Sequence, residues 1–133
     1  MREIKFRGKR KHGSEWLIGD LNHIDGQVFV FPRTDDTPLN SPDWFEVDPK
    51  TVGQYVGIKD KDGKELYEGD ICPIEGIPCY VQYSGFWGVK FSFKANFGSY
   101  SFTDICNHFS GRDFVCDDIE VIGNIHDNPE LLK

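Results

Sequence analysis

The sequence has no long hydrophobic run. No stretch of its 133 residues approaches the roughly 20 consecutive apolar residues that a membrane-spanning helix needs. The first residues are charged and no apolar segment follows them, so a secretory signal is not expected either. These absences predict a cytoplasmic protein, and in that compartment the four cysteines should remain thiols.

Features that favour helices are also scarce. The chain has 1 Met but 14 Gly, 11 Phe, 5 Tyr and 3 Trp. Aromatic residues fit pleated strands and glycines fit turns, so this composition favours a strand-and-turn protein. The length suits one domain with a substantial core, and we expect residues 1–133 to form a single domain.

The cysteines lack the spacing of a metal site. Six residues separate Cys72 from Cys79 and nine separate Cys106 from Cys116. Structural zinc sites favour pairs separated by two to four residues. Cys106 and His108 lie too close for a usual pair, and the other histidines are scattered. We expect no metal and no other cofactor, and we interpret Cys79 and Cys106 as small buried hydrophobes.

The segment Asp60-Lys-Asp-Gly63 has acids like those of a calcium loop, but the rest of the loop is missing. With Gly63 as the sixth position, Ile58 and Gly69 occupy the first and twelfth, where acids are required. The segment instead predicts a β-hairpin, with Asp62 and Gly63 in a type I′ turn.

No arrangement of residues predicts catalysis. Cys116 with His108 or His126 and Asp127 supplies the residue types of a nucleophilic site, but a surface turn explains the His126-Asp127 pair more simply. The chain is therefore expected not to be an enzyme, with no catalytic residues.

Two further sequence features also have structural interpretations. Glu68 and Asp70 point the same way in an extended segment, and Asp70 is expected to accept hydrogen bonds from nearby backbone amides. Gly53 and Gly57 lack the following Lys and helix of a phosphate-binding loop. They flank Tyr55 in a strand, which indicates strong curvature and a small barrel.

Alternating apolar residues predict most of the elements. Two such runs, on either side of Ser84-Gly85, form the clearest hairpin, over residues 79–93. Residues 28–31 read as a strand buried on both faces. Residues 101–109 have the apolar spacing of a short helix, and helical turns are expected after Asp48 and Asn128. Residues 32–43, with three prolines, read as a long surface loop.

The net charge of −7 is unevenly distributed. Residues 1–12 contain six of the 15 Lys and Arg and a single acid, so the remainder of the chain is strongly acidic. An acidic body repels phosphate backbones, which makes nucleic acid an unlikely partner. The simpler interpretation of the basic segment is an edge strand kept soluble by its charges.

Three segments resemble one known family. They are the opening Met1-Arg-Glu-Ile-Lys-Phe-Arg7, the central Val52-Gly-Gln-Tyr-Val-Gly-Ile-Lys-Asp-Lys-Asp-Gly-Lys-Glu-Leu-Tyr-Glu-Gly-Asp-Ile71, and the C-terminal Val121-Ile-Gly-Asn-Ile-His-Asp-Asn-Pro-Glu-Leu-Leu-Lys133. Together they resemble the YopX family of phage and prophage proteins. The resemblance implies a bacterial host cell as the setting, and it implies no established reaction.

The expected fold is mainly β, a small SH3-like or related barrel with extra hairpins and one or two short helices. Leu66-Tyr-Glu-Gly-Asp-Ile71 is similar to a turn found in SH3-like barrels. The leading functional hypothesis is a non-enzymatic phage or prophage accessory protein that binds protein or assembles with itself. The candidate interface residues are Tyr55, Tyr67, Phe86 and Trp87. The alternative is nucleic-acid binding by a small β-barrel through Lys5, Arg7, Lys9, Arg10 and Lys11.

Overall fold

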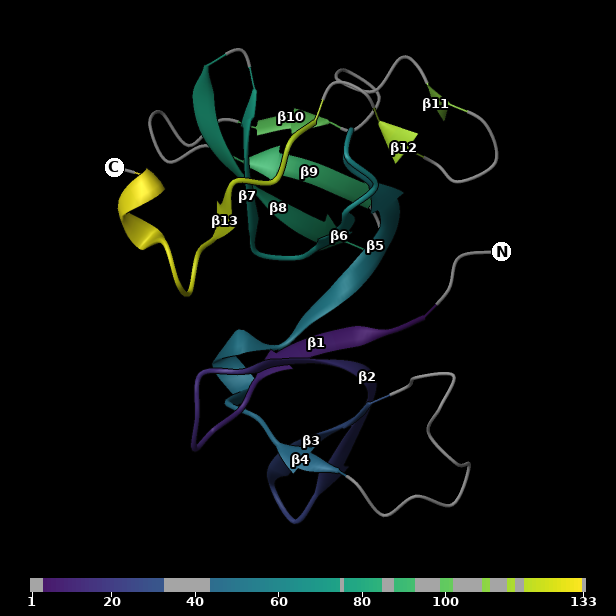
Figure 1. The fold of residues 1–133 in the computed structure, drawn as a ribbon, viewed down its shortest axis with the longest axis vertical. Coiled ribbons are helices and arrows are strands. Elements are labelled where there is room, and N and C mark those ends of the chain that lie inside the picture. Colours follow the sequence, from purple (N-terminus) through teal and green to yellow (C-terminus); the bar gives the residue numbers. More distant parts are fainter. Residues whose placement is uncertain are drawn as a thin grey trace. The chain divides into compact units, whose positions relative to one another are not determined.

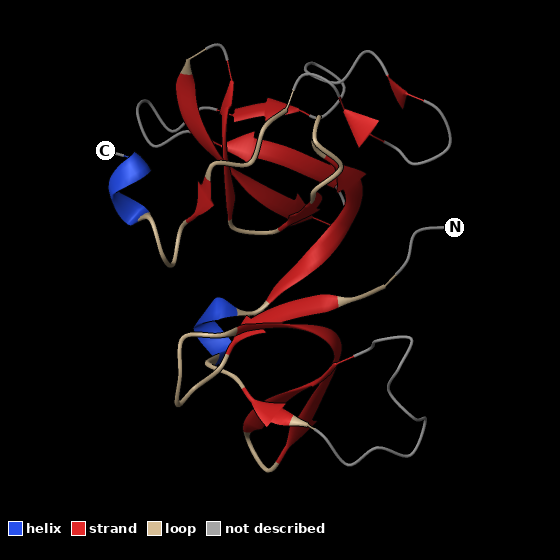
Figure 2. Cartoon of the chain, in the orientation of Figure 1, coloured by secondary structure: helices blue, strands red, loops and turns tan. Residues whose placement is uncertain are grey.

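The computed structural model describes residues 4–32, 44–74, 76–84, 88–92, 99–101, 109–110, 115–116 and 119–132. Within these residues the fold is mainly β, with two antiparallel sheets and only short 3-10 helical turns (Figures 1 and 2). The chain divides into two compact units, residues 1–55 and 56–133, and each unit has its own core. Strand β5 (Gly53–Lys59) belongs to both units, so the larger sheet includes strands of both.

The first unit is an antiparallel sheet with strand order β5-β1-β2-β3-β4. Its strands are β1 (Phe6–Lys9), β2 (Trp16–Ile24), β3 (Gln27–Pro32), β4 (Phe45–Glu46) and the first residues of β5 (Gly53–Lys59). The β2–β3 hairpin closes at Asp25 and Gly26, whose φ angles are 51° and 80°. Positive φ at both central residues defines a type I′ turn, whose twist matches that of the paired strands.

The core of the first unit is small. Val28, Val30 and Val47 are buried at its centre, and the partly buried Leu17, Leu21 and Val52 pack against them. Glycine permits the close approach of neighbouring strands, because a Cβ at Gly19 would collide with the backbone oxygen of Phe31. The alternation of β3 places its two valines inside, while Phe29 and Phe31 are half-buried on the opposite face.

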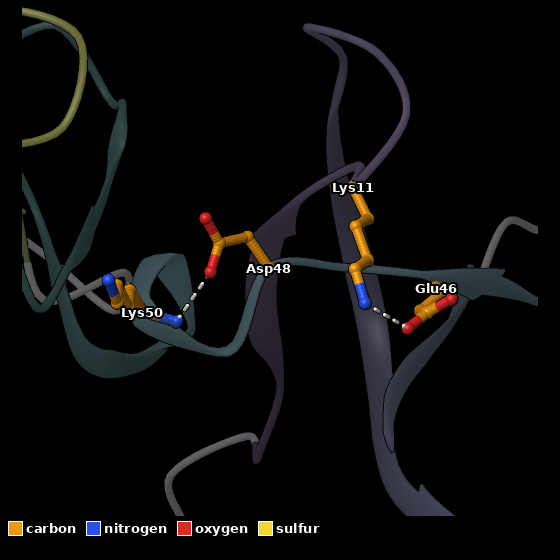
Figure 3. A network of polar contacts seen from close by, with 4 residues as sticks. All are labelled: Lys11, Glu46, Asp48 and Lys50. Atoms are coloured by element: carbon orange, nitrogen blue, oxygen red, sulfur yellow. Dashed lines mark hydrogen bonds and ion pairs between the residues drawn. The ribbon is translucent and has the colours of Figure 1, made fainter.

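A capped turn connects β4 to β5. The 3-10 turn η1 (Pro49–Thr51) begins after Asp48, whose Oδ1 accepts the Lys50 N–H at 3.0 Å (Figure 3). Proline fits the first position because its missing N–H would have no partner there. The Thr51 hydroxyl donates to the Asp48 carbonyl at 2.6 Å and accepts the Lys9 N–H at 2.8 Å, which ties the turn to β1. The helical turn expected after Asp48 is confirmed.

The second unit contains the other antiparallel sheet, with order β10-β9-β8-β7-β13. The last residues of β5 pair with β6, and Lys59 pairs in parallel with Val115 of β12, which in turn pairs with β11. The strand bounds are β6 (Glu65–Tyr67), β7 (Asp70–Ile74), β8 (Ile77–Ser84), β9 (Gly88–Ser92), β10 (Ser99–Ser101), β11 (Phe109–Ser110), β12 (Val115–Cys116) and β13 (Gly123–Asn124).

The hairpin predicted over residues 79–93 is confirmed as β8 paired with β9. In the preceding β7–β8 hairpin, Ile74 pairs with Ile77, and Pro73 lies opposite Pro78. Pairs in an antiparallel ladder alternate between hydrogen-bonded and non-hydrogen-bonded positions. The position next to the turn-closing pair is non-hydrogen-bonded, so both prolines occupy sites where no N–H is required.

The core of the second unit is larger. Its fully buried side chains include Leu66, Ile71, Phe91 and Ile119. The carboxylate of Asp60, which is only 2% exposed, lies at its edge and accepts three backbone N–H groups. Two come from Asp62 and Lys64 in its own turn, and the third comes from Val121, 61 residues along the chain.

The turn after Asp60 is a hairpin turn, but its predicted type is wrong. Gly63 has φ of 81°, whereas Asp62 is not among the residues with positive φ. The Gly63 N–H donates to the Asp60 carbonyl and the Asp60 N–H donates to the Lys64 carbonyl. This is a three-residue loop with glycine in the left-handed position. The Asp60 carboxylate accepts the Asp62 N–H and so favours a right-handed conformation before Gly63.

The C-terminal segment folds around two asparagines. Asn124 Oδ1 accepts the N–H groups of His126 and Asp127, and Asn128 Oδ1 accepts the Asn124 N–H. The 3-10 turn η4 (Pro129–Leu132) follows, so the helical turn predicted after Asn128 is confirmed. A Cβ at Gly123 would lie 2.6 Å from Asn128 Oδ1, which explains the glycine at that position.

Other expectations are corrected or lie outside the described residues. The strands in the described part of the chain form open sheets rather than the expected closed SH3-like barrel. That part contains no α-helix: Ser101 and Phe109, the ends of one predicted helix, are strand residues, and 102–108 fall outside it. The predicted loop at 32–43 also lies outside it, except for Pro32 in β3. No helix within the described ranges has the length and apolar character required to span a bilayer.

Candidate functional site

The basic segment forms an ordered row on one face of the first sheet. Successive residues of a strand point to opposite faces, so Arg7 and Lys9 of β1 share one face. Lys5 and Lys11, which flank the strand, reach the same side through contacts with Tyr55 and Glu46. Arg10, the fifth residue of the predicted basic patch, belongs to the other face, where its guanidinium lies 5.1 Å from the ring centre of Phe45. We call the four residues on the shared face the cation row.

Lys5, Arg7 and Lys11 of the cation row contact aromatic or acidic side chains. The Lys5 ammonium lies 5.0 Å from the ring centre of Tyr55, and the Arg7 guanidinium lies 5.0 Å from that of Trp16. Lys11 Nζ is 3.0 Å from Glu46 Oε2 (Figure 3). A cation over an aromatic face keeps its charge and is held in place by the electrons of the ring.

An apolar surface lies on the same face of the sheet as the cation row, on the strands β2 and β3. Residues directly opposite each other on paired strands share a face. Because Arg7 pairs with Ile18 and Asp20 pairs with Phe31, the cation row, Ile18 and the two half-buried phenylalanines of β3 lie on the same face.

Trp44 completes this surface. Its ring centre is 4.5 Å from that of Phe29 and 5.6 Å from that of Phe31, with an interplanar angle of 1° to the latter. Ile18 is 43% exposed and Trp44 is 42% exposed, high values for large apolar side chains. We call Ile18, Phe29, Phe31 and Trp44 the aromatic face.

Tyr55 and Tyr67, two of the four candidate interface residues predicted from the sequence, are buried. Tyr55 is 6% exposed and Tyr67 is 3% exposed, so both belong to the interior. Tyr55 also carries Lys5 over its ring. Phe86 and Trp87 lie outside the described residues. The exposure on which the choice of Tyr55 and Tyr67 rested is therefore absent.

Sequence reasoning missed the aromatic face because it interpreted residues 28–31 as buried on both faces. Phe29 and Phe31 alternate with two valines, and the sequence of a run of four apolar residues does not indicate which face of the strand is exposed. One signal was present in the preceding strand. There Ile18 shares a face with the polar Asp20 and Asn22, as expected of a face that meets solvent.

Asp70, the first residue of β7 after the turn from β6, has the structural role predicted for it. Asp70 is 1% exposed, and its Oδ2 accepts the Tyr67 N–H at 2.8 Å. This bond closes the turn before β7, so the carboxylate stabilises a local backbone conformation.

The cysteines differ from one another in chemistry. Cys116 is disulfide-bonded, which corrects the expectation that all four are thiols. It also removes the thiolate from the nucleophilic set of Cys116, His126 and Asp127.

Cys72 and Cys79 are free, buried and directly opposite each other on β7 and β8. Burial raises the pKa of both thiols, and the nearby Asp70 raises that of Cys72 further. Such thiols are poor nucleophiles.

The described residues include no cluster of three His, Cys, Asp or Glu side chains that could hold a metal ion. The buried carboxylates of Asp60 and Asp70 already accept backbone N–H groups. Within that part of the chain, the arrangement best suited to binding is the aromatic face with its neighbouring cation row.

Comparison with known proteins identifies the family. The family model described as "YopX protein" matches residues 5–133, so the chain belongs to the YopX family. No curated protein matches. The crystal structure of protein EF1440 from Enterococcus faecalis is similar over 100% of both chains, at 25% sequence identity and a TM-score of 0.43.

Proposed function

We propose that this member of the YopX family is a non-enzymatic accessory protein that binds another polypeptide through the aromatic face of its first unit. The observation that carries the proposal is Trp44, which is 42% exposed while packed against Phe29 and Phe31. Ile18 extends the same apolar surface towards β1. Contiguous exposed apolar side chains rimmed by polar residues are typical of protein interaction sites.

The residue types of this surface support a protein partner. Trp, Phe, Tyr and Arg are enriched in the central parts of protein interfaces, where a few large side chains supply most of the binding energy. Trp44 is held by two rings, so binding would immobilise few additional rotamers. A rigid aromatic anchor reduces the entropy lost on association.

The alternative, nucleic-acid binding through the basic segment, has weaker support. Arg7 is 9% exposed, and Lys11 and Arg10 form ion pairs with Glu46 and Glu15. Phosphate contacts require accessible cations, and a net charge of −7 opposes the approach of a polyanion. Asp20 and Glu46 also lie on this face and would repel phosphates.

Affinity capture with the full-length chain tests the proposal. Tagged wild-type protein, an Ile18→Asp variant and a Trp44→Ala variant are incubated with lysate from the bacterial host, and the retained proteins are identified. We expect one or more proteins to be retained by the wild type and lost with both variants. Calorimetry with the purified partner should then show a loss of about 2 kcal/mol or more for a hot-spot residue.

Ile122→Asp is the matched control, because Ile122 is an exposed isoleucine, at 45%, in the second unit. It should retain the same proteins as the wild type, and circular dichroism should show that all variants are folded. Retention of the same set by the Ile18 and Trp44 variants would contradict the proposal.

A further inference from the structure

We infer that Cys72 and Cys79 form a reversible disulfide across the β7–β8 hairpin, by exchange with a small-molecule disulfide such as oxidised glutathione. This modification site goes beyond the proposed function, because the pair belongs to the second unit and the aromatic face belongs to the first. The inference depends on the register of the hairpin, on the pairing of its turn end and on the chemistry of the two thiols.

The register places the two cysteines opposite each other. Cys72 is the Cα partner of Cys79, and both side chains are buried in the same core cluster. Pro73 and Pro78, the next pair towards the turn, have no N–H groups to exchange, so by alternation the cysteine pair occupies a hydrogen-bonded position. Cα atoms at such a position are about 5.5 Å apart, close to the commonest separation in disulfides. The bond can therefore form without a change of register.

The same position makes the bond reversible. Opposite Cβ atoms on paired strands are about 4.5–5.5 Å apart, whereas a disulfide brings them to about 3.8 Å. The two strands must approach each other slightly, and this strain makes the bond easier to reduce. A disulfide between Cys72 and Cys79 is therefore expected to open again in the presence of a thiol reductant.

The turn end of the hairpin has little support from neighbouring strands. Within the described strands, β13 pairs with β7 only at Asp70 and Ile71, and the pairing of β9 with β8 ends at Tyr80. Pro73 and Pro78 also lack the N–H group through which a further strand could bind. Segments with few backbone hydrogen bonds open before the rest of a fold does. Local opening of this end would expose both thiols to a small disulfide.

The closed hairpin protects the thiols from reaction. Both side chains are fully buried, and the Cys79 Sγ donates to the Ile77 carbonyl at 3.3 Å. Burial raises the pKa of both thiols, and Asp70 and Asp60 raise that of Cys72 further. Because the thiolate is the nucleophile, exchange begins in the open hairpin and at Cys79, whose pKa these two acids do not raise.

The exchange proceeds in two steps. The Cys79 thiolate forms a bond with one sulfur of oxidised glutathione, whose own disulfide breaks, and one glutathione thiolate leaves. The Cys72 thiolate then attacks the Cys79 Sγ and releases the second glutathione. In total the two protein thiols lose two electrons and two protons, and oxidised glutathione takes them up to become two thiols. The new bond connects β7 to β8 and holds the turn end closed until it is reduced.

Oxidation of the folded, full-length chain tests the inference. The protein is incubated with oxidised glutathione, alkylated, digested after glutamate, which separates the two cysteines at Glu75, and analysed by mass spectrometry over time. We expect two peptides linked through Cys72 and Cys79, and recovery of both thiols after addition of dithiothreitol. Cys72→Ser and Cys79→Ser each leave one thiol of the pair, so oxidation of either variant should stop at the mixed disulfide with glutathione.

Two glycine variants test whether the turn end controls access. Gly76 in the β7–β8 turn and Gly26 in the β2–β3 turn have φ of 81° and 80°, and a Cβ at either position would meet nothing within 4 Å. Valine is strained at such a φ, so Gly76→Val should favour opening beside the cysteines and increase the oxidation rate about fivefold or more. Gly26→Val is the matched control in the first unit and should react at the wild-type rate. Circular dichroism checks that both variants are folded.

Four results would overturn the inference. Thiols that stay reduced in the wild type and in Gly76→Val would show that the pair does not react. Stable mixed disulfides on both wild-type cysteines would show that the two sulfurs do not meet. Equal oxidation rates of the two glycine variants would show that opening of this end does not control access. A bond from Cys72 or Cys79 to a different cysteine would indicate exchange with the disulfide of Cys116 instead.

Discussion

Asp60 shows how a single carboxylate can connect distant parts of the chain. It is almost fully buried, and its two oxygens accept N–H groups from Asp62, Lys64 and Val121 at 2.8–3.0 Å. The carboxylate is well suited to this role because it only accepts hydrogen bonds. Removing an oxygen acceptor there leaves a buried backbone donor without its partner.

Asp60→Asn is therefore expected to destabilise the protein by about 2–3 kcal/mol. The amide keeps the shape but turns one acceptor into a donor that faces a backbone N–H, and bonds to charged groups are worth about 1.5–3 kcal/mol. Urea unfolding followed by circular dichroism measures the change. Asp62→Asn, at an exposed position in the same turn, should change stability by less than about 0.5 kcal/mol. Similar effects of the two substitutions would contradict the role assigned to Asp60.

At Gly63, the cost of backbone strain can be measured without a contribution from packing. Its φ is 81°, and a Cβ at this position would meet nothing within 4 Å. Only the left-handed conformation therefore penalises a side chain. Gly63→Val should cost about 1 kcal/mol or more, and Gly63→Asn should cost much less because asparagine tolerates this region. Thermal unfolding of both variants checks the order, and equal stability of the two variants and the wild type would show that residue 63 is not left-handed in solution.

At the scale of elements, local chemistry made several features predictable. The β8–β9 hairpin follows from two alternating runs around a glycine turn. The 3-10 turns η1 and η4 begin at the prolines of Asp-Pro and Asn-Pro, where a polar cap precedes the proline. Asp70 accepts the backbone amide expected for an acid in its turn. Each of these features depends on residues close together in the sequence.

The features that could not be predicted depend on long-range pairing. The third hydrogen bond to the Asp60 carboxylate comes from the Val121 N–H, which no local pattern connects to it. β5 reads as one strand, yet its first residues pair with β1 and its last residue pairs with β12. Gly57, with φ of 89°, lies between these two pairings. Closure of a barrel depends on such pairings as well, so strand content alone did not determine it.

The β7–β8 pair gives a prediction for alkaline pH. Burial raises the pKa of the Cys72 thiol above its ordinary value of 9.0, whereas the unfolded chain titrates near that value. The protonated thiol is therefore favoured in the folded state. Its contribution to stability is complete below about pH 9 and is lost as the pH rises further, because the unfolded state releases its proton first.

Urea unfolding of wild type and Cys72→Ala at pH 8, 9 and 10 measures this effect. We expect the wild-type free energy of unfolding to fall with a steeper slope above pH 9, by up to about 1.4 kcal/mol per pH unit more than in the variant. Groups other than Cys72 titrate in both proteins, so the difference isolates this thiol. Parallel pH profiles would show that Cys72 is accessible to solvent or already ionised.

At the scale of the whole molecule, the two units differ in charge. Residues 1–55 carry eight Lys and Arg against nine Asp and Glu, while residues 56–133 carry seven against thirteen. The net charges are −1 and −6, so most of the acidity belongs to the second unit. A basic row in one unit and excess acid in the other allow two kinds of association between copies, one apolar and one electrostatic.

Self-association is expected, because the aromatic face is exposed and the sheets of the described residues end in edge strands. Strand edges that nothing covers can pair with another copy, and symmetric dimers are the commonest oligomers. Light scattering at micromolar concentration should give a mass above the 15.3 kDa of one chain.

If Ile18 and Trp44 form the contact, high salt should leave the mass unchanged and Ile18→Asp should reduce it. If the cation row of one copy binds the acidic unit of another, high salt should reduce it and Ile18→Asp should have little effect. A mass of one chain at every concentration and salt tested would exclude both contacts. The aromatic face would then be assigned to binding a different protein.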